Sequence, residues 1–327
     1  MARLLLASSV LVAAATAPVH ANPDEAPAGP SVTFSGFVDT SLSTYLTPDA
    51  AREQGVLLGL DQLELDVDVA VSPGLRLRGD LQFFPQLGVD TSEGAVVVFD
   101  QIVEQAFAEW FVEGGDRGFI LRLGKWNAPV GFETIDPTGL WQFSQGLLFV
   151  RATPANLTGF ALGWVGESTS AQLWLTNDWD TPGTPKDASV GGRVQQAVSD
   201  VGTIGLSATY GALADDPGRL MIDLDLAFTF DALRLGGQLN FGMQDDLTSL
   251  GFLVSANYAF TDAFSLTARV DWLDRELLDG PYKGMSLTLA GLVNLTKGLD
   301  LIAEVRADLP DGGDTSVLAA LELLASF

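Results

Sequence analysis

The chain contains no cysteine, and its one histidine, His20, lies close to its start. Without cysteine there are no disulfides, no thiolate nucleophiles and no thiolate metal sites. Beyond residue 21 the chain also lacks an imidazole, so it has none of the histidine bases on which most catalytic triads depend. These absences predict a protein that is not an enzyme and that has no cofactor and no metal site.

Positive charge is scarce. The sequence has 17 lysines and arginines against 42 aspartates and glutamates, which gives a formal net charge of −25. A chain this acidic repels polyanions. We therefore expect no nucleic-acid partner.

Long apolar runs are absent after the first residues of the chain. Residues 4–17 are apolar, follow the basic Arg3 and lead to the small-residue ending Val19-His20-Ala21. This pattern predicts a secretory signal peptide over residues 1–21. A short lead over residues 22–31 follows, rich in proline, alanine and acidic residues. No later apolar run reaches about 18 residues, so no membrane-spanning helix is predicted there.

What the chain does have is an apolar and polar alternation with a period of two. Leu63, Leu65 and Val67 alternate with Glu64 and Asp66, for example. The alternation continues in segments to the last residue, and the gaps between segments are short and long in turn. This predicts a transmembrane antiparallel up-and-down β-barrel over residues 32–327, apolar outside and polar inside, with short periplasmic turns and long extracellular loops. A soluble barrel is the alternative, but this many strands would enclose a cavity too wide for side chains to fill.

The segments predict about 16 strands, an even number as bacterial barrels require. Counts of fourteen or eighteen are the alternatives. The predicted ranges are 32–45, 60–71, 75–84, 103–113, 119–126, 157–166, 171–177, 189–199, 203–212, 219–230, 233–242, 249–260, 264–273, 284–295, 299–308 and 315–327.

Charged residues on the polar register are predicted to line the lumen, because a charge that faces lipid is costly. They are Glu64, Asp66, Asp68, Arg76, Arg78, Asp80, Glu109, Arg122, Arg193, Asp223, Asp225, Arg234, Arg269, Asp271, Glu304 and Arg306. Acidic residues outnumber basic ones on this register, which favours cations. The alternative is that most of these charges pair with one another and stiffen the wall. A Ca²⁺ ion at Glu64, Asp66 and Asp68 is a further alternative that we do not adopt.

The longest gap, residues 127–155, mixes aromatic and aliphatic residues with Glu133, Asp136 and Arg151. Its apolar residues need a surface on which to pack, and irregular backbone at membrane depth is tolerated only against protein or a wet cavity. We expect this segment to fold into the lumen as a constriction, with Glu133, Asp136 and Arg151 near the narrowest point. The alternative is an extracellular loop that packs on its neighbours.

The last predicted strand alternates in the same way and ends on Phe327. It resembles the sorting signal that the barrel assembly machinery reads in outer-membrane barrels. That resemblance implies export to the bacterial outer membrane, with membrane lipid and the assembly machinery as partners.

Between Glu104 and Gly166 the sequence resembles a known family, putative β-barrel porin-2, also called OmpL-like. The matching elements are Gln105-Ala106-Phe107, Gly124-Lys125-Trp126, Pro129-Val130-Gly131, the stretch Phe143-Ser144-Gln145-Gly146-Leu147-Leu148-Phe149, Pro154 and Thr158-Gly159. The resemblance implies an outer-membrane barrel.

The barrel pattern and the resemblance together predict a passive channel for ions and small polar solutes, with a mild preference for cations. The alternative is a barrel that does not conduct and serves as a structural or surface-binding protein. Sixteen-stranded porins are commonly trimers, so the strand count suggests a homotrimer.

Overall fold

A computed structural model describes residues 29–47, 55–83, 102–112, 117–177, 188–212, 217–277 and 280–327. The predicted signal peptide and most of the short lead lie outside these residues. Within them, no helix has the length and apolarity needed to cross a membrane.

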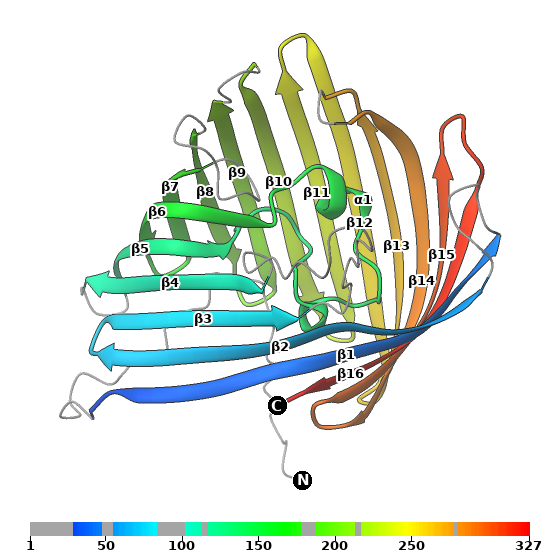
Figure 1. Ribbon diagram of the computed structural model, residues 1–327, viewed down its shortest axis with the longest axis horizontal. Helices are drawn as coiled ribbons and strands as arrows, with labels where there is room; N and C mark the ends of the chain where they lie inside the picture. The colour runs from blue at the N-terminus through cyan, green and yellow to red at the C-terminus, as the bar shows by residue number, and fades with distance from the viewer. Residues whose placement is uncertain are drawn as a thin grey trace, which may run out of the picture.

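Sixteen antiparallel strands close into one barrel, in which each strand pairs with its neighbours in sequence and β1 pairs with β16 (Figure 1). The predicted architecture is therefore confirmed. The strands are β1 (Ser31–Thr47), β2 (Val56–Ser72), β3 (Leu75–Phe83), β4 (Val103–Val112), β5 (Gly118–Asn127), β6 (Asn156–Val165), β7 (Thr169–Thr176), β8 (Ala188–Val198), β9 (Gly202–Ala212), β10 (Arg219–Phe230), β11 (Leu233–Gln244), β12 (Leu247–Thr261), β13 (Phe264–Arg275), β14 (Tyr282–Thr296), β15 (Leu299–Pro310) and β16 (Ser316–Ser326).

The alternation of apolar and polar residues in the sequence places apolar side chains on the outer face of the wall and polar side chains on its inner face. Leu224 pairs with Leu239, and Asp223 pairs with Asn240 on the opposite face of the same two strands. The leucine Leu239 is 55% exposed on the outside, whereas Asp223 is fully buried on the inside. A one-residue slip would exchange these faces, so the alternation fixes the register.

Short turns gather at one rim of the barrel. The β10–β11 turn has two residues, and the first, Asp231, has a positive φ of 51°. Two-residue hairpin turns favour this backbone, because its twist matches that of the strands. Stacked aromatic pairs lie at the same rim, with ring centroids 6.0 Å apart for Phe228 and Phe230 and 5.8 Å for Phe260 and Phe264.

The opposite rim carries the longer connections, with one exception. Strands β11 and β12 are longer than predicted, so only Asp245 and Asp246 join them, and Asp245 has a φ of 54°. The expectation that every connection on this rim is long is therefore wrong at β11–β12. The two strands extend their pairing to Gln244 and Leu247, which the polar composition of residues 243–248 did not suggest.

The inner face is not polar throughout. A buried apolar cluster lies on the inward side of β4–β7 and β10 and packs against the first residues after β5. Its members are Phe107, Trp126, Val130, Leu157, Ala161, Trp174 and Met221. These side chains fill this side of the barrel, so the simple rule of apolar outside and polar inside fails here.

Candidate functional site: a loop across the lumen

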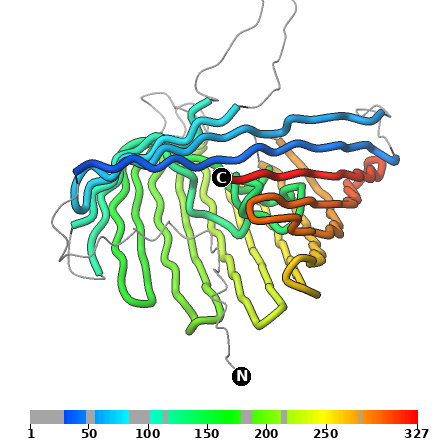
Figure 2. Tube along the Cα trace, turned by 90° about the horizontal axis from the view of Figure 1, so that it is seen from below, coloured from blue at the N-terminus to red at the C-terminus, as the bar shows by residue number. Residues whose placement is uncertain are grey.

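The segment between β5 and β6 runs inside the barrel (Figures 1 and 2). It contains the short 3₁₀ helix η2 (Pro137–Gly139) and the helix α1 (Leu147–Arg151), which packs against β12 and β13. In a closed ring of sixteen strands, β13 lies opposite β5. The segment therefore reaches from one wall of the barrel to the other.

Backbone groups of this loop bond to side chains of the far wall. The Phe132 amide donates to Gln238 Oε1 of β11 at 3.2 Å, and the Leu147 amide donates to Asp271 Oδ1 of β13 at 2.9 Å. The Ser144 amide donates to Glu304 Oε2 of β15 at 3.0 Å. The carboxylates of Asp271 and Glu304 are stronger acceptors than the neutral amide of Gln238, so the loop is held most firmly at β13 and β15.

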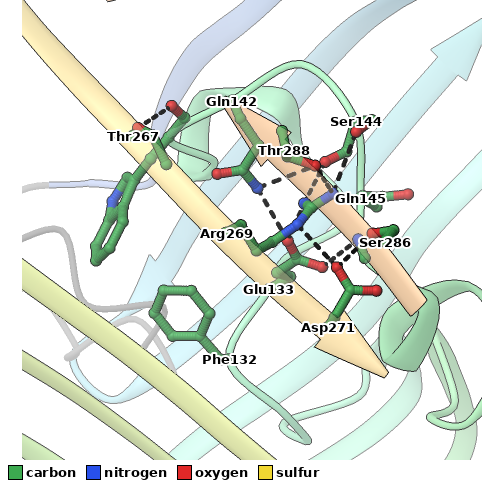
Figure 3. Close-up of polar contacts among 12 residues, drawn as sticks. Phe132, Glu133, Gln142, Ser144, Gln145, Thr267, Arg269, Asp271, Ser286 and Thr288 are labelled. Atoms are coloured by element: carbon green, nitrogen blue, oxygen red, sulfur yellow. Dashed lines mark hydrogen bonds and ion pairs between the residues drawn. The ribbon is translucent and has the colours of Figure 1, made fainter. Parts of the chain in front are cut away.

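Arg269 of β13 is the centre of this attachment (Figure 3). Its Nη1 lies 2.6 Å from Glu133 Oε1 of the loop, and its Nε lies 3.2 Å from Asp271 Oδ2 of the wall. The same guanidinium donates to the Ser144 carbonyl at 2.5 Å. The side chain of Arg269 has no solvent exposure, so its charge depends on these partners.

Glu133 is bonded on both of its carboxylate oxygens. Besides Arg269, Oε1 accepts from Gln142 Nε2 at 2.9 Å, and Oε2 accepts from the Gly146 amide at 2.6 Å. The carboxylate of Glu133 thus links the parts of the loop at Gln142 and Gly146 to Arg269 of β13. Its contacts fit a residue that anchors the loop to the wall rather than one that faces a passage.

A small residue on the wall makes room for the loop. At Gly236 of β11, an added Cβ would lie 2.0 Å from the Phe132 ring. The same ring makes an edge-to-face contact with Trp141, with centroids 5.2 Å apart. Any larger residue at position 236 would collide with this aromatic pair.

The three residues predicted to lie together at the constriction lie in three places. Asp136 lies near Glu104 and Asp66 on the side of β2–β4. Arg151 is exposed on α1, with its guanidinium 4.4 Å above the ring of Tyr282. Glu133 of the loop bonds Arg269 of β13, so the three residues form no single ring of charge.

Burial and the neighbouring carboxylates Glu104 and Asp66 raise the pKa of Asp136 from 3.8 to about 8. Burial raises the pKa because it penalises the charged form, and nearby negative charge adds to this effect. The loop therefore places a carboxyl group among carboxyl groups of the wall.

Two cavities lie on different parts of the loop. One of about 480 Å³ borders Ser144, Arg151 and Arg306. The other, of about 660 Å³, borders Pro137, Trp141 and Arg234. They share no lining residue.

The charges predicted to line the lumen lie on the inward register, and most arginines among them pair with carboxylates. Donor and acceptor atoms are 2.9 Å apart in Arg122–Glu109, 2.5 Å in Arg193–Asp225 and 2.7 Å in Arg306–Asp308. Arg76 contacts Asp68, and Arg78 is shared among Asp66, Asp68 and Asp80 at 3.2, 3.1 and 2.8 Å.

Arg234 differs from these arginines. It bonds the neutral Asn257 Oδ1 at 2.7 Å and stacks over Trp141 with its guanidinium carbon 5.0 Å from the ring centroid. Conversely, Asp223 accepts from the side-chain amides of Gln238 and Asn240, and from no cation among the described residues. Amide donors leave the negative charge of this carboxylate uncompensated.

Glu104 is an inward residue that strict alternation does not predict. Starting from the inward pair Phe107 and Glu109, a period of two would turn Glu104 outward. The β3–β4 pairing skips this residue, since Asp80 pairs with Gln105 and Leu81 with Val103. Such a bulge reverses the alternation, and it brings Glu104 to the inner face.

Comparison with known proteins agrees with this architecture. The chain of DcaP, an outer-membrane channel of Acinetobacter baumannii, is 11% identical, with a TM-score of 0.68 over 91% of this chain and 98% of that one. An anion-selective porin from Comamonas acidovorans is 16% identical, with a TM-score of 0.62 over 91% and 100% of the two chains. OmpT of Vibrio cholerae, in its trimer form, is 13% identical, with a TM-score of 0.64 over 92% and 100%.

At these identities the structures show a shared fold. No curated protein matches the chain in sequence. A family model described as putative beta-barrel porin-2, OmpL-like, matches residues 31–320, which include all but the end of the last strand. The family and the fold point to a channel rather than to an enzyme. The chain belongs to the putative β-barrel porin-2, OmpL-like family.

Proposed function

We propose that this protein is an outer-membrane porin that lets ions and small polar solutes diffuse passively, with a mild preference for cations. The supporting observation is the imbalance of charge on the inner face. Among the described residues of the inner face, Glu64, Glu104 and Asp223 form no ion pair with an arginine, and they outnumber Arg234, which bonds the neutral Asn257. The uncompensated field inside the barrel is therefore negative, and charge of this sign favours cations.

The proposal includes the compartment and the assembly. Residues 1–21 act as a signal peptide, and Phe327 ends the strand that the assembly machinery reads. The trimer form of OmpT supports a homotrimer for this chain by its similar fold.

Conductance across a planar lipid bilayer tests the proposal. With KCl at different concentrations on the two sides, we expect a reversal potential of cation-selective sign. The preference should weaken at high salt, because the screening length falls from about 10 Å at 0.1 M to about 3 Å at 1 M. An anion-selective sign would contradict the cation preference, and it would leave the channel itself in place.

A variant of the wall sharpens this test. Replacing Asp66 and Asp68 together by asparagine leaves Arg76 and Arg78 with fewer carboxylate partners. We expect the reversal potential to move towards zero or to the anion side. Glu167→Gln is the control, since Glu167 is an exposed acid that pairs with Arg117 in the β6–β7 turn region.

The alternative is a barrel that does not conduct and has a structural or surface-binding role. The loop bound to β11, β13 and β15 and the apolar cluster on β4–β7 favour this alternative, because both occupy space inside the barrel. Purified protein that inserts into the bilayer without any conductance would support it and would overturn the channel.

A further inference from the structure

Although the sequence predicted no metal site, we infer that the wall formed by β2–β4 and the tip of the loop hold a Ca²⁺ ion between them. The wall supplies Glu64, Asp80 and Glu104, one from each of three adjacent strands. The loop supplies Asp136, which lies next to Glu104.

The spacing of the wall carboxylates fits one ion. One oxygen from each of Glu64, Asp80 and Glu104 lies within 4.8 Å of the other two. Two ligands of the same Ca²⁺ ion, each at about 2.3–2.6 Å from the metal, are at most about 5 Å apart. The three oxygens can therefore reach a common centre.

Two oxygens at this place accept from no donor group of the protein. Glu104 is fully buried, and its Oε1 accepts from Asn127 Nδ2 at 2.6 Å. Within the described residues its Oε2 and the buried Oδ1 of Asp136 accept from no amide, hydroxyl or cation, and the polar groups beside them are other carboxyl groups. A buried charged oxygen without a partner is costly, so these atoms point to a ligand.

Protein cations do not neutralise the group. Within the described parts of the chain, Glu64 and Glu104 take part in no ion pair, and Arg78 divides its charge among Asp80, Asp66 and Asp68. Four carboxyl groups therefore share a fraction of one positive charge. A divalent cation restores the balance, because carboxylate oxygens are the ligands that Ca²⁺ prefers.

The chemical type of the ligand atoms favours Ca²⁺ over other metal ions. All donors are oxygens, and the chain beyond residue 21 has neither histidine nor cysteine, which zinc and copper favour. Mg²⁺ needs shorter bonds and near-ideal octahedral geometry. The flexible coordination of Ca²⁺ suits ligands that come from three strands and one loop.

The ion would complete the attachment of the loop. Arg269 fastens the loop to β13, and the Ca²⁺ site fastens its tip to the wall formed by β2–β4. With both attachments the loop would be held at two sides of the barrel.

Calorimetric titration of the folded protein with CaCl₂, after treatment with a chelator, tests the site. We expect saturable binding of one Ca²⁺ per barrel and weaker binding of Mg²⁺. Glu104→Gln should weaken Ca²⁺ binding by about tenfold or more, because it removes a charged ligand. Asp136→Asn should weaken binding as well, and it changes only the loop, so it provides a second variant if Glu104→Gln does not fold.

Glu322→Gln is the matched control. Glu322 is also inward and buried, and its oxygens accept from no donor group in the described structure, but it lies on β16 beside Asp39. We expect this variant to bind Ca²⁺ as the native protein does. Absence of saturable binding would overturn the inference and would mean that the carboxyl groups share protons instead. Equal affinity for Mg²⁺, or loss of binding in Glu322→Gln alone, would also overturn it. Conductance is not needed for this test, so its outcome is independent of the channel proposal.

Discussion

At the scale of single residues, Arg269 carries the attachment of the loop. Its side chain lies between Glu133 and Asp271 without solvent exposure. Arg269→Met would leave two buried carboxylates without their cation, and a broken buried pair costs about 3–5 kcal/mol. We expect a correspondingly lower free energy of unfolding in denaturant titrations of the barrel.

Arg117→Met is the control for this variant. Arg117 pairs with Glu167 at 2.5 Å, but both side chains are mostly exposed. Exposed pairs contribute about 0–1 kcal/mol. If both variants lower the stability equally, the buried ion pairs of Arg269 do not stabilise the barrel more than an exposed pair does.

At the scale of elements, the loop depends on the small residue beneath it. Gly236→Ala would bring a methyl group into the ring of Phe132. We expect the loop to shift, with a loss of about 1–3 kcal/mol as in other overpacked sites. Denaturant titration measures the loss, and a change in single-channel conductance would report the shift of the loop.

Gly79→Ala on β3 is suited as its comparison, because an added Cβ there has no atom within 4 Å. Gly79→Ala makes the same glycine-to-alanine change in a strand, but the added methyl group collides with no other atom. A similar loss of stability in both variants would mean that backbone effects of the glycine, rather than contact with Phe132, explain the result.

The strands were the part of the fold that the sequence predicted best. The range of β10 was predicted to the residue, and most other ends differ by one or two residues. A wall with one face in lipid imposes the alternation on every strand, and for this reason a single sequence suffices. The start of β2 was missed by four residues, and the extra two residues at the facing ends of β11 and β12 replace the expected loop, because pairing beyond the alternating segment leaves no pattern.

The site was predicted less completely. The sequence identified the loop and its charged residues, but it did not show that Glu133 bonds Arg269 while Asp136 meets Glu104. These partners are distant in sequence, and only the closed ring brings them together. Glu104 was missed because of its bulge, and the cluster around Trp126 and Trp174 was missed because inward apolar residues break the rule used to read the strands.

For the whole molecule, the last residue extends the pairing of β1 with β16 that closes the ring. The Phe327 amide donates to the Gly36 carbonyl at 3.0 Å, and the Gly36 amide donates to the Phe327 carbonyl at 3.3 Å. Deleting Phe327 removes this pair of bonds between the two ends of the sheet, together with the proposed sorting residue. We expect less folded barrel in the outer membrane, measured by the mobility of unheated samples in gel electrophoresis.

Phe327→Tyr keeps both bonds and the terminal aromatic ring, so it should assemble normally. An unchanged amount of the deletion variant would show that neither the bonds nor the ring are needed.

The loop that joins opposite walls also has a mechanical consequence. A barrel with an empty lumen deforms easily under lateral pressure, because bending its wall breaks few hydrogen bonds. Here the loop from β5 to β13 connects opposite sides of the wall, and Arg269, Asp271 and Glu304 bind it at the far side. Compression of the barrel along this diameter would compress the loop, and extension would lengthen its charged hydrogen bonds. The cross-section should therefore keep its shape when lateral pressure in the surrounding bilayer changes, and it should deform most readily perpendicular to the loop.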